Sequence, residues 1–137
     1  VTTITSSLSA TPSPRLATDG TNVCWTEGTS VNNVATGAAV KCQVNGTTST
    51  LLSNLSSIPN GVDISGSQVY VSLPGVGQGG SVATSGSIVR IPLAGGASTT
   101  LVSGINPNVL QVVGNSVCFF HSAGMNSTSN AIMCAPK

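Results

Sequence analysis

The side chains that could carry out catalysis are few in this sequence. It contains one histidine, His121, and three acids, Asp19, Glu27 and Asp63. A Ser-His-Asp arrangement needs an acid that orients the histidine, and glycoside hydrolysis needs two apposed carboxylates. No spacing brings these residues together, so we expect an exposed or packing role for His121 and a turn role for Asp19. The sequence predicts no enzyme, no cofactor and no metal site.

The four cysteines offer two other kinds of chemistry, a zinc site or disulfide bonds. They are Cys24, Cys42, Cys118 and Cys134. Structural zinc usually takes close pairs such as Cys-x-x-Cys, and spacings of 18, 76 and 16 contain none. An even number of cysteines is typical of a disulfide-bonded protein in an oxidising compartment. We therefore expect disulfides and a secreted, extracellular protein.

Composition limits both the fold and the partners. Four Lys and Arg against three Asp and Glu give a net charge of +1, which is too little for binding to a nucleic-acid backbone. No apolar run approaches the roughly 20 residues of a membrane span, and the start at Val1 suggests a processed product. Ser and Thr supply 37 residues and Gly another 16, whereas long helix-forming side chains are scarce. This composition favours an all-β fold. Sequons at Asn45, Asn54 and Asn126 are possible glycosylation sites.

An internal repeat organises the chain into three modules. Residues 19–25, 65–71 and 113–119 align, with their glycines 46 and 48 positions apart. Residues 40–46, 89–95 and 132–136 align further along each module. A fourth strand follows at 49–53 and at 99–103. We expect four short strands in each module, with tight turns at residues 45–46 and 95–96 and long loops at 26–38, 72–87 and 121–130.

The third module reaches the end of the sequence before its fourth strand. Residues 2–8 match that missing strand, with Ile4 and Leu8 at the positions of Leu51 and Leu55. The strand can be supplied by the same chain or by a neighbour. We expect this segment to act as an assembly strand, through Thr3, Ile4, Thr5 and Leu8. The predicted modules are residues 15–55, 61–105, and 109–137 with strand 2–8, in one domain.

A family resemblance follows from two of these motifs. Residues 22–27, Asn-Val-Cys-Trp-Thr-Glu, resemble the Tyr-Trp-Thr-Asp signature of six-bladed extracellular propellers of the low-density-lipoprotein-receptor type. Residues 88–96 look like the third strand and turn of bacterial propeller repeats of the same group. The resemblance implies propeller blades, although cysteines replace the signature Tyr and three modules stand in for six. A β-trefoil, which also has three four-strand repeats, is the alternative.

The repeat also suggests how the cysteines pair. Cys24 and Cys118 share one repeat position and Cys42 and Cys134 another, whereas the middle module lacks both cysteines and aligns Tyr70 and Ile91 there. Loss of both together is expected for a bonded pair on neighbouring strands. We therefore favour Cys24–Cys42 and Cys118–Cys134 among the three possible pairings.

Two functional hypotheses follow from this architecture. Closed propellers typically need 4–8 blades, so three blades leave strand edges that can pair with another chain. The first hypothesis is a non-enzymatic extracellular structural protein that self-assembles through its N-terminal strand into a filament or a closed oligomer. The alternative is a secreted binding module that presents the loops 26–38, 72–87 and 121–130 to a glycan or a protein. Trp25, Glu27 and Arg15 are candidates for one sugar pocket, but core packing is favoured for Trp25.

Overall fold

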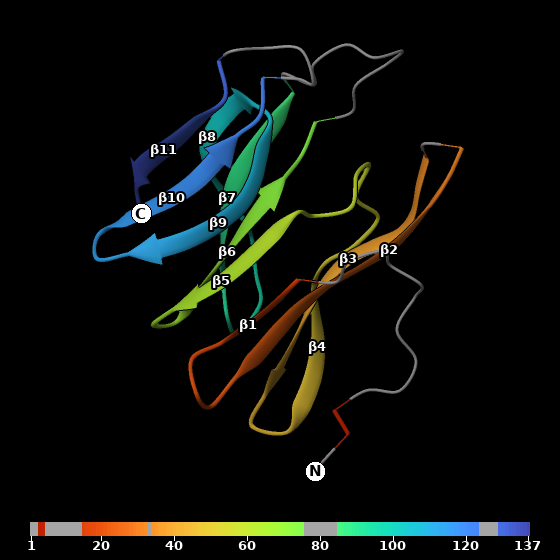
Figure 1. Ribbon diagram of the computed structural model, residues 1–137. Helices are drawn as coiled ribbons and strands as arrows, with labels where there is room; N and C mark the ends of the chain where they lie inside the picture. The colour runs from red at the N-terminus through yellow and green to blue at the C-terminus, as the bar shows by residue number, and fades with distance from the viewer. Residues whose placement is uncertain (1–2, 5–14, 33, 76–84, 124–128) are drawn as a thin grey trace.

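The computed structural model describes residues 3–4, 15–32, 34–75, 85–123 and 129–137. Within these ranges the chain is all-β, with eleven strands in three antiparallel sheets and no helix that could span a membrane (Figure 1). Strands β1 to β4 form the first sheet, β5 to β8 the second and β9 to β11 the third. Each sheet follows the order of the sequence, so every strand pairs with its neighbour in the chain.

The bounds of the strands show one difference between the sheets. The first sheet contains β1 (Leu16–Thr18), β2 (Val23–Val31), β3 (Val34–Val44) and β4 (Thr47–Leu52). The second contains β5 (Gly61–Ser65), β6 (Gln68–Leu73), β7 (Gly86–Pro92) and β8 (Thr99–Ile105). The third contains β9 (Pro107–Val113), β10 (Ser116–His121) and β11 (Ala131–Pro136). Among the described residues, the third sheet therefore has no counterpart of β4 and β8.

Turn chemistry explains the hairpins within the sheets. Asn45 and Gly46 both have positive φ, 50° and 79°, as a two-residue primed turn between β3 and β4 requires. Gly66 and Gly114 also have positive φ, in the short turns after β5 and β9. Asn and Gly tolerate this backbone region better than other residues, so the sequence determines where these strands reverse.

The predicted loop over residues 26–38 is wrong. β2 continues to Val31 and β3 begins at Val34, so this segment is a long two-stranded ribbon. The register shifts between Glu27 and Thr29, where a Cβ on Gly28 would lie 3.0 Å from Ala38 Cα. Gly28 therefore allows close approach at a bulge, and the polar residues Thr29, Ser30 and Thr36 beyond it lie in strands that solvent can reach.

Two apolar cores join the three sheets. The first lies between the first and second sheets and includes Cys24, Cys42, Ile64 and Val69. The second lies between the second and third sheets and includes Tyr70, Ile88, Leu110, Val117 and Phe119. β5 lies beside both β1 and β9, which places the middle sheet between the other two. The sheets are therefore packed layers in the order first, second, third.

One predicted alignment is shifted by a residue in the middle sheet. The sequence placed Ile91 opposite Tyr70, but Tyr70 pairs with Arg90, and Ile91 pairs with Val69. This register turns Val89 and Ile91 toward the first core and leaves Arg90 half-buried. Alternation of side chains between the two faces of a strand decides the register, because a slip by one residue would place Arg90 in that core.

The N-terminal residues lie away from the third sheet. Thr3 and Ile4 are exposed and belong to no strand. In Figure 1 they form the red segment at the lower right of the view, whereas β11 lies at the upper left. The predicted strand residues Thr5 and Leu8 lie outside the described residues. In the structure as described, Thr3 and Ile4 thus take no part in completing the third sheet of their own chain.

Candidate functional site

The outer edge of β11 has no partner strand in the part of the chain that the structure describes. β3 and β7, the corresponding third strands, each pair on one side with the preceding strand and on the other with a fourth strand. β11 pairs only with β10 among the described residues. An unpaired edge presents backbone N–H and C=O groups that can bind another strand. The candidate site among the described residues is thus a strand edge.

The pairing register shows which β11 groups face outward. Cys118 and Cys134 are directly opposite, with a Cα–Cα distance of 4.0 Å. This distance matches a non-hydrogen-bonded antiparallel pair, for which the typical value is about 4.5 Å instead of about 5.5 Å. The N–H and C=O of Cys134 therefore point away from β10, and so do those of Ile132, two residues earlier. In the first sheet, the matching residue Cys42 has Ser49 of β4 on that side.

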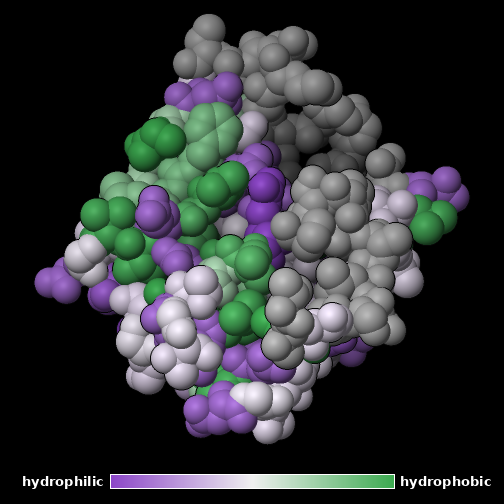
Figure 2. Space-filling model, turned by 60° about the horizontal axis from the view of Figure 1, so that its bottom comes forward, coloured by the Kyte–Doolittle hydropathy of each residue, from purple (hydrophilic) through white to green (hydrophobic). Residues whose placement is uncertain are grey.

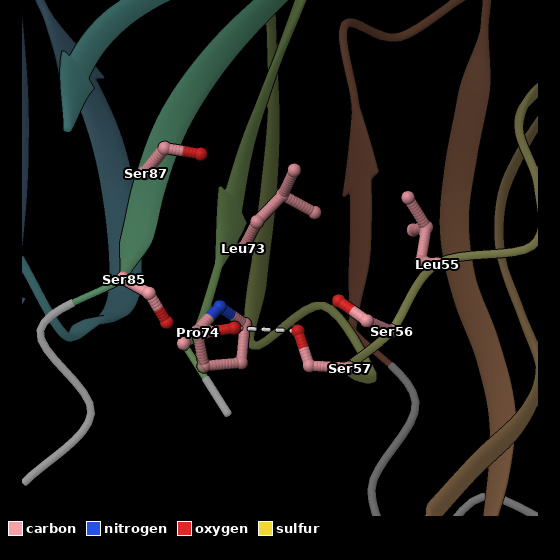
Figure 3. A pocket seen from close by; sticks show the side chains of 8 residues that line it. Leu55, Ser56, Ser57, Leu73, Pro74, Ser85 and Ser87 are labelled. Carbon is pink, nitrogen blue, oxygen red and sulfur yellow. Dashed lines mark hydrogen bonds between the residues drawn. The ribbon is translucent and has the colours of Figure 1, made fainter. Parts of the chain in front are cut away.

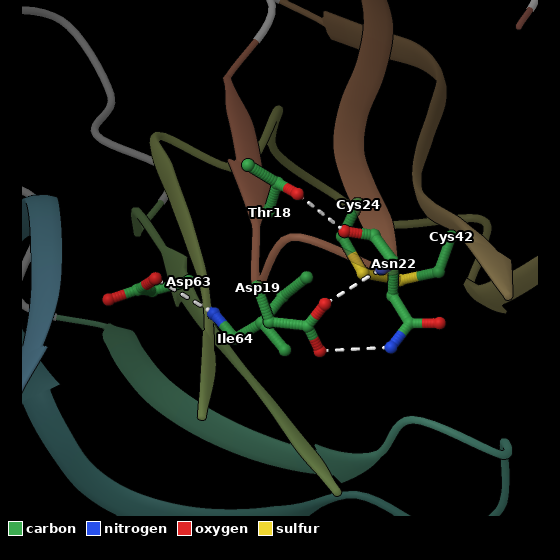
Figure 4. Close-up of a disulfide and its surroundings, with 7 residues drawn as sticks. All are labelled: Thr18, Asp19, Asn22, Cys24, Cys42, Asp63 and Ile64. Atoms are coloured by element: carbon green, nitrogen blue, oxygen red, sulfur yellow. Dashed lines mark hydrogen bonds between the residues drawn. A yellow bond between two sulfur atoms is a disulfide. The ribbon is translucent and has the colours of Figure 1, made fainter. Parts of the chain in front are cut away.

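The two disulfides join Cys24 to Cys42 and Cys118 to Cys134, the pairing that the sequence favoured. Both bridge the second and third strands of their sheets, but their surroundings differ. Cys24 and Cys42 are 0% exposed in the first core, with Ile64 of β5 beside them (Figure 4). Cys118 is half-buried and Cys134 is exposed. Two disulfides are compatible with a secreted or extracellular protein.

Apolar side chains surround the exposed disulfide. Val109 and Val113 of β9 are 53% and 57% exposed, and Ile132 of β11 is 74% exposed. They share the face of Cys118, because Val113 pairs with Ser116 and Cys118 pairs with Gln111. Hydrophobic surface gathers on the left of Figure 2, the side on which the third sheet lies in Figure 1. Contiguous exposed apolar surface commonly marks an interaction site.

The residues considered for a sugar pocket do not form one. Trp25 is 4% exposed, and its indole Nε1 donates a hydrogen bond to Glu27 Oε1 at 2.7 Å. Glu27 Oε2 also pairs with Lys41 Nζ at 2.9 Å. Arg15 is not part of this group, since its Nε donates to the carbonyl oxygen of Asn60 at 3.0 Å. The indole ring therefore has no free face on which a sugar could stack.

The remaining candidate acids have structural partners. Asp19 Oδ1 accepts hydrogen bonds from the backbone N–H groups of Asn22, at 2.7 Å, and Thr21, at 2.9 Å (Figure 4). These bonds, led by the one from Asn22, lower the pKa of Asp19 from its usual value. Asp63 Oδ2 accepts from the Val112 N–H at 2.6 Å and ties the second sheet to the third.

His121 is also used within the fold. Its Nδ1 accepts a hydrogen bond from the Asn106 N–H at 3.2 Å. In the part of the chain that the structure describes, no three His, Cys, Asp or Glu residues are grouped as metal ligands. None of the described contacts of His121 is with an acid, so the geometry that a catalytic triad needs is not present there.

A small pocket lies between the segment that follows β4, at residues 55–57, and the end of β6 with the start of β7. It has a volume of about 170 Å³ and is lined by Leu55, Leu73, Pro74 and several serines (Figure 3). Ser57 Oγ donates a hydrogen bond to the Pro74 carbonyl oxygen across it. Ligand pockets usually measure 300–1,000 Å³ and carry convergent polar or charged groups. No charged residue lines this pocket, so it is a weaker candidate than the β11 edge.

Two of the three sequons lie on described surface. Asn45 and Asn54 are both exposed, with φ of 50° and 54°. The hydroxyl residues of their sequons, Thr47 and Ser56, are exposed as well. Asn126 lies outside the described residues. Exposed turns are where glycan attachment is sterically feasible, so both sites stay as predictions.

Comparisons with known proteins add little to this picture. No family model matches the chain, and no curated protein matches it. Among solved structures, it is similar to a crystal structure of the computationally designed Ika4 protein, at 17% identity. The match covers 93% of this chain and 94% of the designed one, with a TM-score of 0.46. Similarity at this level assigns neither a family nor a function to this chain.

Proposed function

We propose that this chain is a non-enzymatic extracellular structural subunit that assembles by strand addition at the open edge of β11. The observation that carries the proposal is the unpaired edge of a three-stranded sheet beside two four-stranded ones. Its outward N–H and C=O groups, at Ile132 and Cys134, are the ones that an added strand would bind. Main-chain hydrogen bonds along such an edge give affinity, and side-chain packing gives register.

We further propose that the three sheets are blades of an open β-propeller. Three separate meander sheets stacked face to face, with β5 beside β1 and β9, are the arrangement expected of successive blades. A β-trefoil would pair strands of different repeats in one barrel. No pairing between sheets occurs among the described residues. An open propeller leaves the outer face of its first sheet and the outer face of its last sheet available to a partner.

The strand that would be added is residues 2–8 of a neighbouring copy. Its Ile4 matches Leu51 and Leu101, which are half-buried and pack against the first and second cores. A donated strand would place Ile4 in the same way against the third sheet. Because Thr3 and Ile4 lie away from β11 in their own chain, donation to a second copy is favoured over completion of the same chain.

The alternative, a secreted glycan- or protein-binding module, has less support than strand addition. The one sugar pocket considered for it contains Trp25, whose ring is buried and whose Nε1 is bonded to Glu27. Low net charge, many small polar side chains and two disulfides suit an extracellular subunit that packs closely with its own copies.

Deletion of residues 1–9 tests the proposal. We expect the truncated protein to fold, to form both disulfides and to stay monomeric at concentrations where the intact chain assembles. Sedimentation velocity and negative-stain microscopy measure the assembly, and non-reducing peptide mapping checks the disulfides. A matched control replaces residues 1–9 by Ser and Gly at equal length and should behave like the deletion. Equal assembly of truncated and intact protein, or a monomeric intact protein at high concentration, would contradict the proposal.

A second variant tests the β11 edge itself. Ile132→Pro removes an outward N–H while leaving the bonds between β11 and β10, and proline is tolerated on an edge strand in this position. Assembly should weaken by at least about tenfold, since a lost hydrogen bond and a steric clash are expected at about 1.4 kcal/mol or more. Ile132→Thr keeps the N–H and a branched side chain and serves as the control. Equal assembly of the Pro and Thr variants would contradict strand addition at this edge.

A further inference from the structure

The two contacts between sheets within the chain have the same polarity. We call the face of each sheet that carries Cys24, Tyr70 or Cys118 its disulfide-side face, and the other its reverse face. The disulfide-side face of the first sheet, with Cys24 and Cys42, packs on Val62, Ile64 and Val69 of the second. These valine and isoleucine residues belong to the reverse face, because Val69 pairs with Ile64 and adjoins Tyr70 in β6.

The second contact repeats this polarity. Tyr70 and Ile88, on the disulfide-side face of the second sheet, pack on Leu110, Val117 and Phe119. These three residues belong to the reverse face of the third sheet, since Phe119 pairs with Leu110 and adjoins Cys118. The hydrogen bond from the Val112 N–H to Asp63 crosses the same contact. Each disulfide-side face therefore packs on the reverse face of the sheet that follows.

One disulfide-side face is left without a following sheet. The three sheets have an equivalent position in their third strands, two residues before the residue that pairs with Cys24, Tyr70 or Cys118. This position is occupied by Val40, Ile88 and Ile132 in the first, second and third sheets. Val40 and Ile88 are 0% exposed, but Ile132 is 74% exposed. Among the described residues this uncovered face of the third sheet bears no charged side chain. This face is therefore apolar and uncharged, like the faces that pack against another sheet.

The complementary surface lies at the other end of the stack. The reverse face of the first sheet is the one reverse face that no other sheet of the described chain covers. The accessible part of this face lies at Leu16, which is 69% exposed, and the half-buried Val23, because Trp25 and Glu27 on the same face are each 4% exposed. In β1, Leu16 pairs with Trp25 of β2, so it stands on the face opposite Ala17 and Cys24.

Chain connectivity selects the occupant. The outer strand β4 leads through residues 53–60 into β5, the inner strand of the sheet packed on the first one, and β8 leads into β9 in the same way. Residues 2–8 lead through 9–15 into β1. A copy that donates residues 2–8 to β11 is therefore connected as the next sheet would be, with its β1 to β4 beside the third sheet.

We infer that the uncovered disulfide-side face of the third sheet binds the reverse face of the first sheet of a second copy, head to tail. The inference rests on the proposed strand addition and adds the surface that accompanies it. Val109, Val113 and Ile132 of one copy are buried against the surface around Leu16 of the next. Such a contact uses different surfaces on the two copies, so repetition gives a closed ring or an open filament.

Lysine substitutions on the two surfaces test this contact. Val109→Lys with Val113→Lys blocks the third-sheet face, and Leu16→Lys blocks the first-sheet face. Each set should weaken association by about 100-fold, since a buried Val or Leu is worth about 1.5–3 kcal/mol and a buried unpaired charge costs more. Val31→Lys with Val34→Lys is the matched control, because these valines are 60% and 64% exposed in the β2–β3 ribbon and lie six and seven residues along β2 and β3 from Trp25 and Lys41, which pair beside Leu16.

Mixing the blocked copies distinguishes a head-to-tail contact from a symmetric one. Each variant retains one native surface, so an equimolar mixture should form discrete dimers that neither variant forms alone at the same concentration. Sedimentation velocity measures these dimers, and circular dichroism confirms that each variant is folded. Absence of dimers from the mixture, or association as strong as in the Val31→Lys, Val34→Lys control, would overturn the inference.

A separate measurement tells this failure apart from failure of the strand addition. A synthetic peptide of residues 1–9 is added to the protein that lacks them, with and without Val109→Lys and Val113→Lys. Equal peptide binding to both, with association lost only in the full-length Lys variant, supports the inference. Peptide binding together with undisturbed association of the Lys variant overturns the face contact and leaves strand addition standing. No peptide binding to either protein overturns strand addition, on which the inference rests.

Discussion

Ile88 and Ile132 are matched in position but have opposite environments. Both occupy the same place in the third strand of their sheets, yet Ile88 is covered by the third sheet and Ile132 faces solvent. The two disulfides also differ in exposure to solvent. Cys24–Cys42 lies inside a core, whereas Cys134 of the other disulfide is exposed. Similar sheets thus make the same kind of surface, and the order of stacking decides whether it is covered. The comparison points to a missing partner at the third sheet.

The largest expected difference comes from truncating the two isoleucines. Ile88→Ala should lower the free energy of unfolding of the isolated chain by about 2–5 kcal/mol, since it removes buried methyl groups and leaves a cavity. Ile132→Ala should change it by about 0.5 kcal/mol or less, as an exposed substitution does. Urea unfolding of the two variants in the background that lacks residues 1–9 measures both values. Equal losses would show that Ile132 is already packed within its own chain.

Removal of each disulfide gives a smaller difference. The two bonds span separations of 18 and 16 residues, so loss of either should cost about 3 kcal/mol in chain entropy. Cys24→Ala with Cys42→Ala should cost about 1 kcal/mol more than Cys118→Ala with Cys134→Ala, because it also leaves a gap between packed sheets. Denaturant unfolding of the two double variants checks the order. A larger loss of unfolding free energy in the Cys118→Ala, Cys134→Ala variant would contradict the buried position of Cys24–Cys42 and the exposed position of Cys134.

The smallest effect concerns the Asp19 turn, which lies outside both compared surfaces. Hydrogen bonds lower the pKa of Asp19 in the folded state. Its contribution to stability is therefore present above the unfolded-state value of about 3.9 and is lost as the pH falls through the folded-state pKa. Asp19→Asn should lower the urea midpoint slightly at pH 7 and by less at pH 2. An equal shift at both pH values would rule out the carboxylate as the cause.

Several features of the fold were accessible from the sequence because they depend on local chemistry. Asn45-Gly46 marks a primed turn in any context, and matched cysteines on adjacent strands predict their own pairing. The short third sheet also follows from the repeat, because residues 109–137 contain no counterpart of the fourth strands predicted at 49–53 and 99–103. The β2–β3 ribbon was missed because its Thr, Ser and Asn residues suit a loop as well as a solvated strand.

The candidate site was only half visible in the sequence. The need for a fourth strand at β11 could be predicted, but the exposed face around Val109 and Val113 could not. Valine at these positions is typical of any strand, and its exposure depends on which sheet packs where. The one-residue shift of Arg90 against Tyr70 illustrates the same limit, because burial of Val89 and Ile91 decides that register. Tertiary packing, which the sequence pattern does not specify, determines both.

Hydrogen exchange at β11 tests the central claim most directly. The amides of Ile132 and Cys134 point to the open edge, whereas those of Met133 and Ala135 face β10. In assembled intact protein, exchange at Ile132 and Cys134 should be slowed at least about 100-fold relative to the chain that lacks residues 1–9. Met133 and Ala135 should be protected in both. Fast exchange at Ile132 and Cys134 in assembled material would contradict strand addition at β11.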